Sequence, residues 1–172
     1  MVPAGRGSAA GSGKERRNFI LNLRKIRQSI LQQYEKGLPL GKAETAAGRF
    51  VTANKFALVR MEQDPFAESI YKADMARMYG PVLVKPLDAS DGAELTDTAR
   101  VIGGTKYRSV RRRTDGTERY FREELLKFFC TRPPVDFYLV PYERGHVILA
   151  ADHYTPTVPD ALFAVMTGVR QS

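Results

Sequence analysis

Two apolar runs in the last third of the chain constrain its fold more than any other feature. They are VDFYLV, residues 135–140, and HVILAAD, residues 146–152, with the polar stretch YERG between them. Because both runs are nearly continuous rather than alternating, we expect strands that are buried on both faces. The sequence therefore predicts a hairpin at the centre of a sheet.

A second hairpin signal lies in the stretch KYRSVRRRTDGTERYF, residues 106–121. Asp115-Gly116 is typical of a tight turn between two antiparallel strands. The candidate strands are residues 103–113 and 118–121, and we call this segment, 103–121, the arginine hairpin.

Alternate residues of a strand face opposite sides, so the arginines should divide between the two faces of the arginine hairpin. Arg111 and Arg113 would share a face with Tyr107, and Arg108 and Arg112 would share the other. Since neither face is a plain core face, we expect the hairpin to stand partly free.

Apolar stripes at helical spacing predict three helices in the N-terminal half, over residues 15–36, 42–63 and 64–80. Asp64-Pro65 is typical of a helix start, and Gly80-Pro81 of a helix end. After these come a short strand at 82–84, an acidic loop at 88–97, a short helix at 121–130 and a last helix at 159–169.

These patterns predict an α+β fold with three N-terminal helices packed with a small, mostly antiparallel sheet and one or two short C-terminal helices. Residues 1–13, rich in Gly, Ser and Ala, are expected to form a flexible tail. The predicted divisions are a helical region, 14–80, and an α+β region, 81–172, or one core shared by residues 14–172.

The net charge of +8 is unevenly distributed. Residues 1–60 carry twelve Lys and Arg against three Asp and Glu, and residues 104–131 carry eight against four. Between them, residues 61–103 carry four against eight. Two basic blocks separated by an acidic segment favour a polyanionic partner.

Other features exclude classes of protein. No apolar run approaches about 18 residues, so we expect no membrane span, and no secretory signal is evident. The one cysteine, Cys130, rules out an internal disulfide and favours a reducing compartment, the cytoplasm. Gly13-Lys14 precedes Glu15 rather than Ser or Thr, so the phosphate-loop pattern fails, and we expect no cofactor.

The favoured interpretation is a non-enzymatic protein that binds DNA or RNA. The basic first helix and the arginine hairpin would contact phosphates, and Tyr107 and Tyr120 would stack on bases. The residues expected at this contact are Arg17, Arg24, Lys25, Lys106, Tyr107, Arg108, Arg111, Arg112, Arg113 and Arg119. The opposing interpretation is a solvated surface whose arginines pair with Glu118, Glu123 and Glu124.

Two other functions stay open. The first is a subunit of a large ribonucleoprotein or phage-type assembly, favoured by Leu21, which lies off the first helical stripe, and by the small residues of the second helix. The second is a nucleic-acid-processing enzyme centred on Asp152 and His153. The acidic loop lacks the spacing of a calcium site, and we expect no metal.

Overall fold

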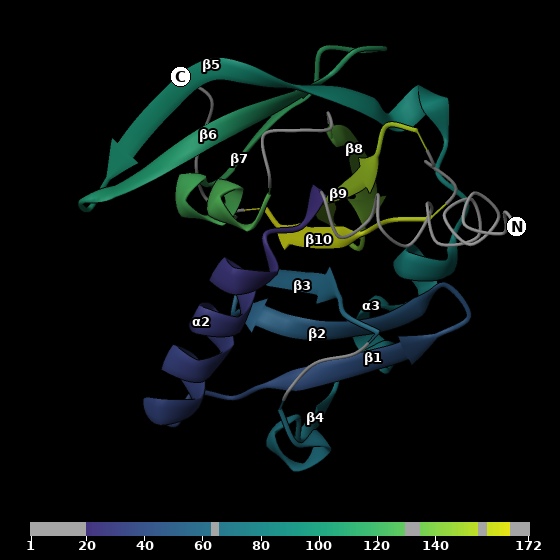
Figure 1. Ribbon diagram of the computed structural model, residues 1–172. Helices are drawn as coiled ribbons and strands as arrows, with labels where there is room; N and C mark the ends of the chain where they lie inside the picture. The colour runs from purple at the N-terminus through teal and green to yellow at the C-terminus, as the bar shows by residue number, and fades with distance from the viewer. Residues whose placement is uncertain (1–19, 63–65, 130–134, 155–157, 166–172) are drawn as a thin grey trace, which may run out of the picture.

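The computed structural model describes residues 20–62, 66–129, 135–154 and 158–165. Its main feature is a ten-stranded mixed sheet in the order β4-β1-β2-β3-β10-β9-β8-β5-β6-β7, in which only β1 and β4 pair in parallel (Figure 1). The strands are β1 Gly41–Thr45, β2 Gly48–Asn54, β3 Ala57–Arg60, β4 Ala73–Asp74, β5 Gly92–Ile102, β6 Thr105–Arg112, β7 Glu118–Arg122, β8 Val135–Tyr142, β9 Gly145–Asp152 and β10 Ala161–Ala164.

The described residues contain two α-helices, α2 Leu23–Glu35 and α3 Ala76–Val84. Three 3₁₀ helices, η1 Glu68–Ile70, η2 Ala89–Asp91 and η3 Glu123–Phe128, complete the fold. The protein is therefore a mostly-β α+β protein, and the prediction of three N-terminal helices packed with a small sheet is wrong.

The central hairpin is confirmed. β8 and β9 pair antiparallel from Val135 opposite Asp152 to Tyr142 opposite Gly145. They lie in the interior of the sheet between β5 and β10. The continuous apolar runs are explained by this position, where side chains on both faces are covered.

The helix predicted over residues 42–63 is instead the three-stranded meander β1–β2–β3. Two tight turns break it, one at Gly48, whose φ is +134°, and one after Asn54, whose Oδ1 accepts a hydrogen bond from Phe56 N at 3.0 Å. Residues 50–53 are buried on both faces because α2 packs on one side of this part of the sheet and α3 packs on the other.

The predicted third helix is also largely wrong. Residues 63–65, which hold its expected start, lie outside the described residues, and η1 and β4 precede α3, which begins only at Ala76. α3 then continues through Pro81 to Val84, replacing the predicted strand 82–84. Proline removes one backbone donor, and burial of Val82 and Leu83 offsets that loss.

Three smaller predictions change as well. The acidic loop 88–97 is η2 followed by the first half of β5. In the range of the predicted helix 121–130, the first two residues end β7, residues 123–128 form the 3₁₀ helix η3, and residue 130 lies outside the described residues. Where a last helix was expected, Ala161–Ala164 form β10, which pairs with both β3 and β9. A four-residue apolar run fits a buried strand or a buried helix equally well, so its secondary structure depends on the neighbouring strands with which it pairs.

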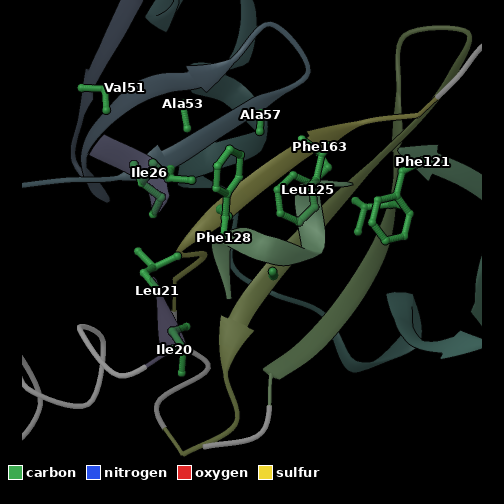
Figure 2. Packing of buried hydrophobic residues seen from close by; sticks show 14 of the residues in the cluster. Ile20, Leu21, Ile26, Val51, Ala53, Ala57, Phe121, Leu125, Phe128 and Phe163 are labelled. Carbon is green, nitrogen blue, oxygen red and sulfur yellow. The ribbon is translucent and has the colours of Figure 1, made fainter. Parts of the chain in front are cut away.

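Helix α2, within the predicted range 15–36, sits over the largest core cluster (Figure 2). Its Ile26 lies among side chains from both halves of the chain, including Val51, Phe128 and Phe163. Leu21 is buried and pairs with Phe129 through an isolated β-bridge, so it is not the free contact surface that its off-stripe position suggested.

Candidate nucleic-acid interface

The predicted turn of the arginine hairpin is present between β6 and β7. The two strands pair from Tyr107 opposite Arg122 to Arg111 opposite Glu118. Gly116 has φ +73°, and Asp115 Oδ1 accepts a hydrogen bond from Thr117 N at 3.0 Å. β6 also pairs with β5 along its other edge, so it is an inner strand and not half of a free ribbon.

Two of the predicted contact residues share one carboxylate. Arg108 Nε donates to Glu123 Oε1 at 3.1 Å, and Lys106 Nζ lies 3.0 Å from Glu123 Oε2. Hydrogen bonds from Arg108 and then Lys106 hold the pKa of Glu123 below its ordinary value. One carboxylate therefore balances one of these two positive charges, and both cations already have a partner within the protein.

The side chain of Arg112 has more partners within the protein than that of Lys106 or Arg108. Its Nε and Nη2 donate to the two carboxylate oxygens of Asp115 at 3.0 and 2.9 Å, and its Nη1 donates to Leu139 O at 3.2 Å. Nη1 also lies 3.5 Å from Asp91 Oδ1. The hydrogen bonds from Arg112 hold the pKa of Asp115 well below its ordinary value. This bidentate pair therefore stabilises the turn between β6 and β7.

The two tyrosines are not placed to stack on bases. Tyr107 is 5% exposed and Tyr120 is 3% exposed. The guanidinium carbon of Arg100 lies 4.7 Å from the centre of the Tyr120 ring. Burial of both rings in the sheet overturns the stacking expected of them.

The other predicted residues differ in their surroundings. Arg111 and Arg113 are exposed and form no ion pair with a described residue, and the half-buried Arg119 donates to Glu118 O at 2.8 Å. Arg24 and Lys25 are exposed on α2, and Arg17 lies outside the described residues. The structure thus brings no cluster of free arginines together at the arginine hairpin.

A basic hollow lies where the first helix meets the end of the arginine hairpin. It has a volume of about 320 Å³ and lies between α2, the β2–β3 turn and η3. Its charged lining residues are Lys36 from α2, Lys55 from the turn, Arg122 at the end of β7, and Lys127 and Glu124 from η3. We call this hollow the basic groove. Four cations face one carboxylate there.

Arg122 is the fixed point of the basic groove. Its guanidinium carbon lies 4.3 Å from the centre of the Phe56 ring, and its Nη1 lies 3.7 Å from Glu124 Oε1. Its Nε is buried and has no hydrogen-bond partner among the described residues. A guanidinium that lies over an aromatic ring keeps its full charge and is suited to an added anion.

The helical wall of the groove is anchored by two hydrogen bonds to one carbonyl. Ser29 Oγ donates to Ala53 O at 2.6 Å, and Gln33 Nε2 donates to the same oxygen at 2.5 Å. Ser29 and Gln33 both lie against the groove. The bonds therefore fix the distance between α2 and the end of β2, and with it the width of the groove.

A second hollow, of about 470 Å³, continues from the first. It is lined by Gly104, Thr105, Lys106 and Glu123, and it shares Arg122 and Glu124 with the basic groove. Its charges balance, because Lys106 is paired with Glu123. The basic groove thus leads on to the end of the β5–β6 hairpin.

Asp152 and His153 do not act on one another. Asp152 is buried, and its Oδ1 accepts a hydrogen bond from Tyr154 N at 2.9 Å. His153 Nδ1 lies 3.0 Å from both carboxylate oxygens of Asp136. Among the described residues no group of His, Cys, Asp and Glu is suited to hold a metal ion.

Sequence reasoning missed most of the basic groove. Lys36, Lys55, Arg122 and Lys127 are not among the residues predicted for the contact, and Lys55 lies inside the range of a predicted helix, 42–63. In GRFVTANKFALVR, residues 48–60, two runs with aromatic and β-branched residues lie on either side of Asn54-Lys55, and this is the signal that indicates two strands with a turn at Lys55.

No protein-family model, curated protein or solved structure matches this chain. Among the described residues, no helix is both long and apolar enough to cross a membrane.

Proposed function

We propose that this chain is a non-enzymatic nucleic-acid-binding protein that holds phosphates of DNA or RNA in the basic groove. The observation that carries the proposal is the convergence of Lys36, Lys55, Arg122 and Lys127 on one hollow that contains a single carboxylate, Glu124. Like charges gathered in this way repel one another, and bound phosphates remove that repulsion.

The pairing of the cations favours the groove over the arginine hairpin as the main contact. Arg108 and Arg112 already have carboxylate partners, so transferring them to phosphates would break existing bonds. Lys36, Lys55 and Lys127 form no ion pair with a described residue. Binding a phosphate through these three lysines therefore breaks no ion pair with a described residue.

One side of α2 extends the contact beyond the hollow. Lys25, Ser29, Gln32 and Lys36 follow one another at spacings of four, three and four residues, so they share a side of the helix. Ser29, Gln32 and Lys36 line the groove, and Lys25 is exposed one turn further on. A phosphate backbone in the groove can therefore continue along the helix past Lys25.

The test is binding to labelled duplex DNA, single-stranded DNA and RNA across a salt series. Replacing Lys36, Lys55 and Lys127 by Gln should weaken binding at least tenfold and lower the salt slope by roughly three phosphate contacts. The matched control replaces Arg77, Lys85 and Arg144, three exposed cations outside both the groove and the arginine hairpin, by Gln. Equal losses in both variants would mean that net charge, and not the groove, governs binding.

A second candidate function is that of a subunit that binds another protein, and the opposite side of α2 favours it. Leu31 and Tyr34 are exposed there, and Tyr34 lines an apolar hollow of about 420 Å³ together with Leu38 and Ile70. Exposed apolar groups of this kind are typical of protein contacts. Concentration-dependent association that Tyr34→Glu abolishes, with no affinity for nucleic acid, would favour this function over the first.

A further inference from the structure

The end of the β5–β6 hairpin projects beyond the rest of the sheet (Figure 1). β5 pairs with β8 only at Gly92 and Ala93, and the pairing of β6 with β7 ends at Tyr107. The β5–β6 ladder continues past that point to Ile102 opposite Thr105. Residues 100–106 therefore form a two-stranded ribbon that pairs with no further strand of the described residues.

The tip of this ribbon is apolar. Val101 is 69% exposed and Ile102 is 46% exposed. The turn that follows consists of Gly103 and Gly104, whose φ values of +58° and +81° fit the two-residue turn of a tight hairpin. Because the turn carries no side chains, Val101 and Ile102 are the apolar side chains nearest the tip.

The ribbon stands at the end of the basic groove. Gly104, Thr105 and Lys106 line the second hollow, and Arg122 lines both that hollow and the groove. A duplex whose phosphates lie in the groove and pass Arg122 would meet the ribbon next. The geometry therefore brings an apolar tip to the place where a bound nucleic acid would continue.

We propose that this tip is a wedge that inserts an apolar side chain between two base pairs of duplex DNA, unstacking and bending it. The inference rests on the proposed function. Stacked bases present flat apolar faces, and a side chain such as that of Ile102 replaces part of the lost stacking while phosphate contacts offset the rest. Pyrimidine–purine steps, which unstack most easily, are the preferred sites.

The small size of the tip favours a base step over a lipid surface. Anchoring in a bilayer interface relies on a broad apolar face, such as one side of an amphipathic helix, or on a lipid chain. Here two β-branched side chains stand at the end of a narrow ribbon. A wedge needs only one of them to enter the stack.

The test uses a duplex with a central TA step that carries 2-aminopurine beside the step and a dye at each end. Wild-type protein should raise the 2-aminopurine fluorescence several-fold and bring the dyes closer together. The Val101→Thr/Ile102→Thr variant keeps the β-branched shape but not the apolar tip. The affinity of this variant for duplex DNA should lie within about tenfold of that of wild type, but the variant should neither raise the 2-aminopurine fluorescence nor bring the dyes closer together. The control Val84→Thr, at an exposed valine of α3, should behave as wild type.

The outcomes separate the two proposals. If wild type binds duplex through the groove but neither unstacks nor bends it, or if the tip variant unstacks it equally, the wedge is overturned and the proposed function stands. If wild type binds no nucleic acid, both fail. Binding to vesicles of phosphatidylserine and phosphatidylcholine that the tip substitutions abolish, with DNA unstacking unaffected, would also overturn the wedge.

Discussion

The guanidinium of Arg122 lies over the ring of Phe56, with its carbon 4.3 Å from the ring centre. Arg122 ends β7 and Phe56 belongs to the β2–β3 turn, so the contact joins two segments that are far apart in the sequence. It also holds the guanidinium at the point that the two hollows share.

Arg122→Leu should weaken nucleic-acid binding several-fold and lower the salt slope by about one phosphate contact. The leucine side chain keeps an apolar contact with Phe56, so the free energy of unfolding should change by less than about 1 kcal/mol. Anisotropy titrations and urea unfolding measure the two effects. The control is Arg113→Leu, which removes an exposed charge outside the groove, and unchanged binding in Arg122→Leu would exclude Arg122 from the contact.

Neighbouring arginines of the hairpin should have different effects on stability. Arg112→Gln removes hydrogen bonds to Asp115 and Leu139 O together with the charge near Asp91, so we expect a loss of about 1–3 kcal/mol in the free energy of unfolding. Arg111→Gln, at an exposed residue without a described ion pair, should change it by less than about 0.5 kcal/mol. Equal values for the two variants in urea unfolding would contradict the assignment of Arg112 to the turn.

The parts of the fold that the sequence predicted are those set by short-range signals. Asp115-Gly116 specifies its turn, and the apolar runs of residues 135–140 and 146–152 specify a buried hairpin, without reference to distant residues. The β1–β2–β3 meander was missed because small and apolar residues from Ala46 to Met61 also fit a helical stripe. Its pairing with β10, with Val59 opposite Ala161, joins residues that no local pattern connects.

The proposed contact in the basic groove involves residues other than those predicted from the sequence. Charge blocks indicated a polyanion, yet the sequence could not show that Glu123 and Asp115 neutralise Arg108 and Arg112. The basic groove depends on the packing of α2 over β2, which brings Lys36 to Lys55. That is a tertiary relationship, and periodicity alone carries no information about it.

His146 should make the protein less stable in mild acid. Its pKa is lowered, first by burial and then by the charges of Arg119 and Arg112, against the opposite influence of Asp115 and Asp91. The unfolded chain therefore takes up a proton at a higher pH than the folded protein does. Stability from this residue is complete above about pH 6.5 and falls as the pH drops from there toward the folded pKa.

The measurement is the free energy of unfolding at pH 7 and at pH 5 for wild type and His146→Gln. Wild type should lose stability between these values, and the variant should lose less. A loss of the same size in both proteins would assign the acid sensitivity to other groups.

The buried pair Arg60 and Asp160 should be among the most sensitive positions of the fold. Arg60 is 5% exposed and Asp160 is 1% exposed, and Arg60 Nε lies 3.5 Å from Asp160 Oδ1. Arg60 Nη2 also donates to Pro159 O at 2.7 Å, so the arginine links β3 to the segment that leads into β10.

Arg60→Met would leave the Asp160 carboxylate buried without its cation, at a cost of about 3–5 kcal/mol in the free energy of unfolding. Glu62→Gln is the matched control, because Glu62 lies 3.3 Å from Arg60 Nη1 but is exposed to water, and it should cost less than about 1 kcal/mol. Urea unfolding measures both variants. Similar small losses in the two variants would mean that water or a shift of the β3–β10 pair relieves the buried charge, and that the pairing of β3 with β10 does not depend on it.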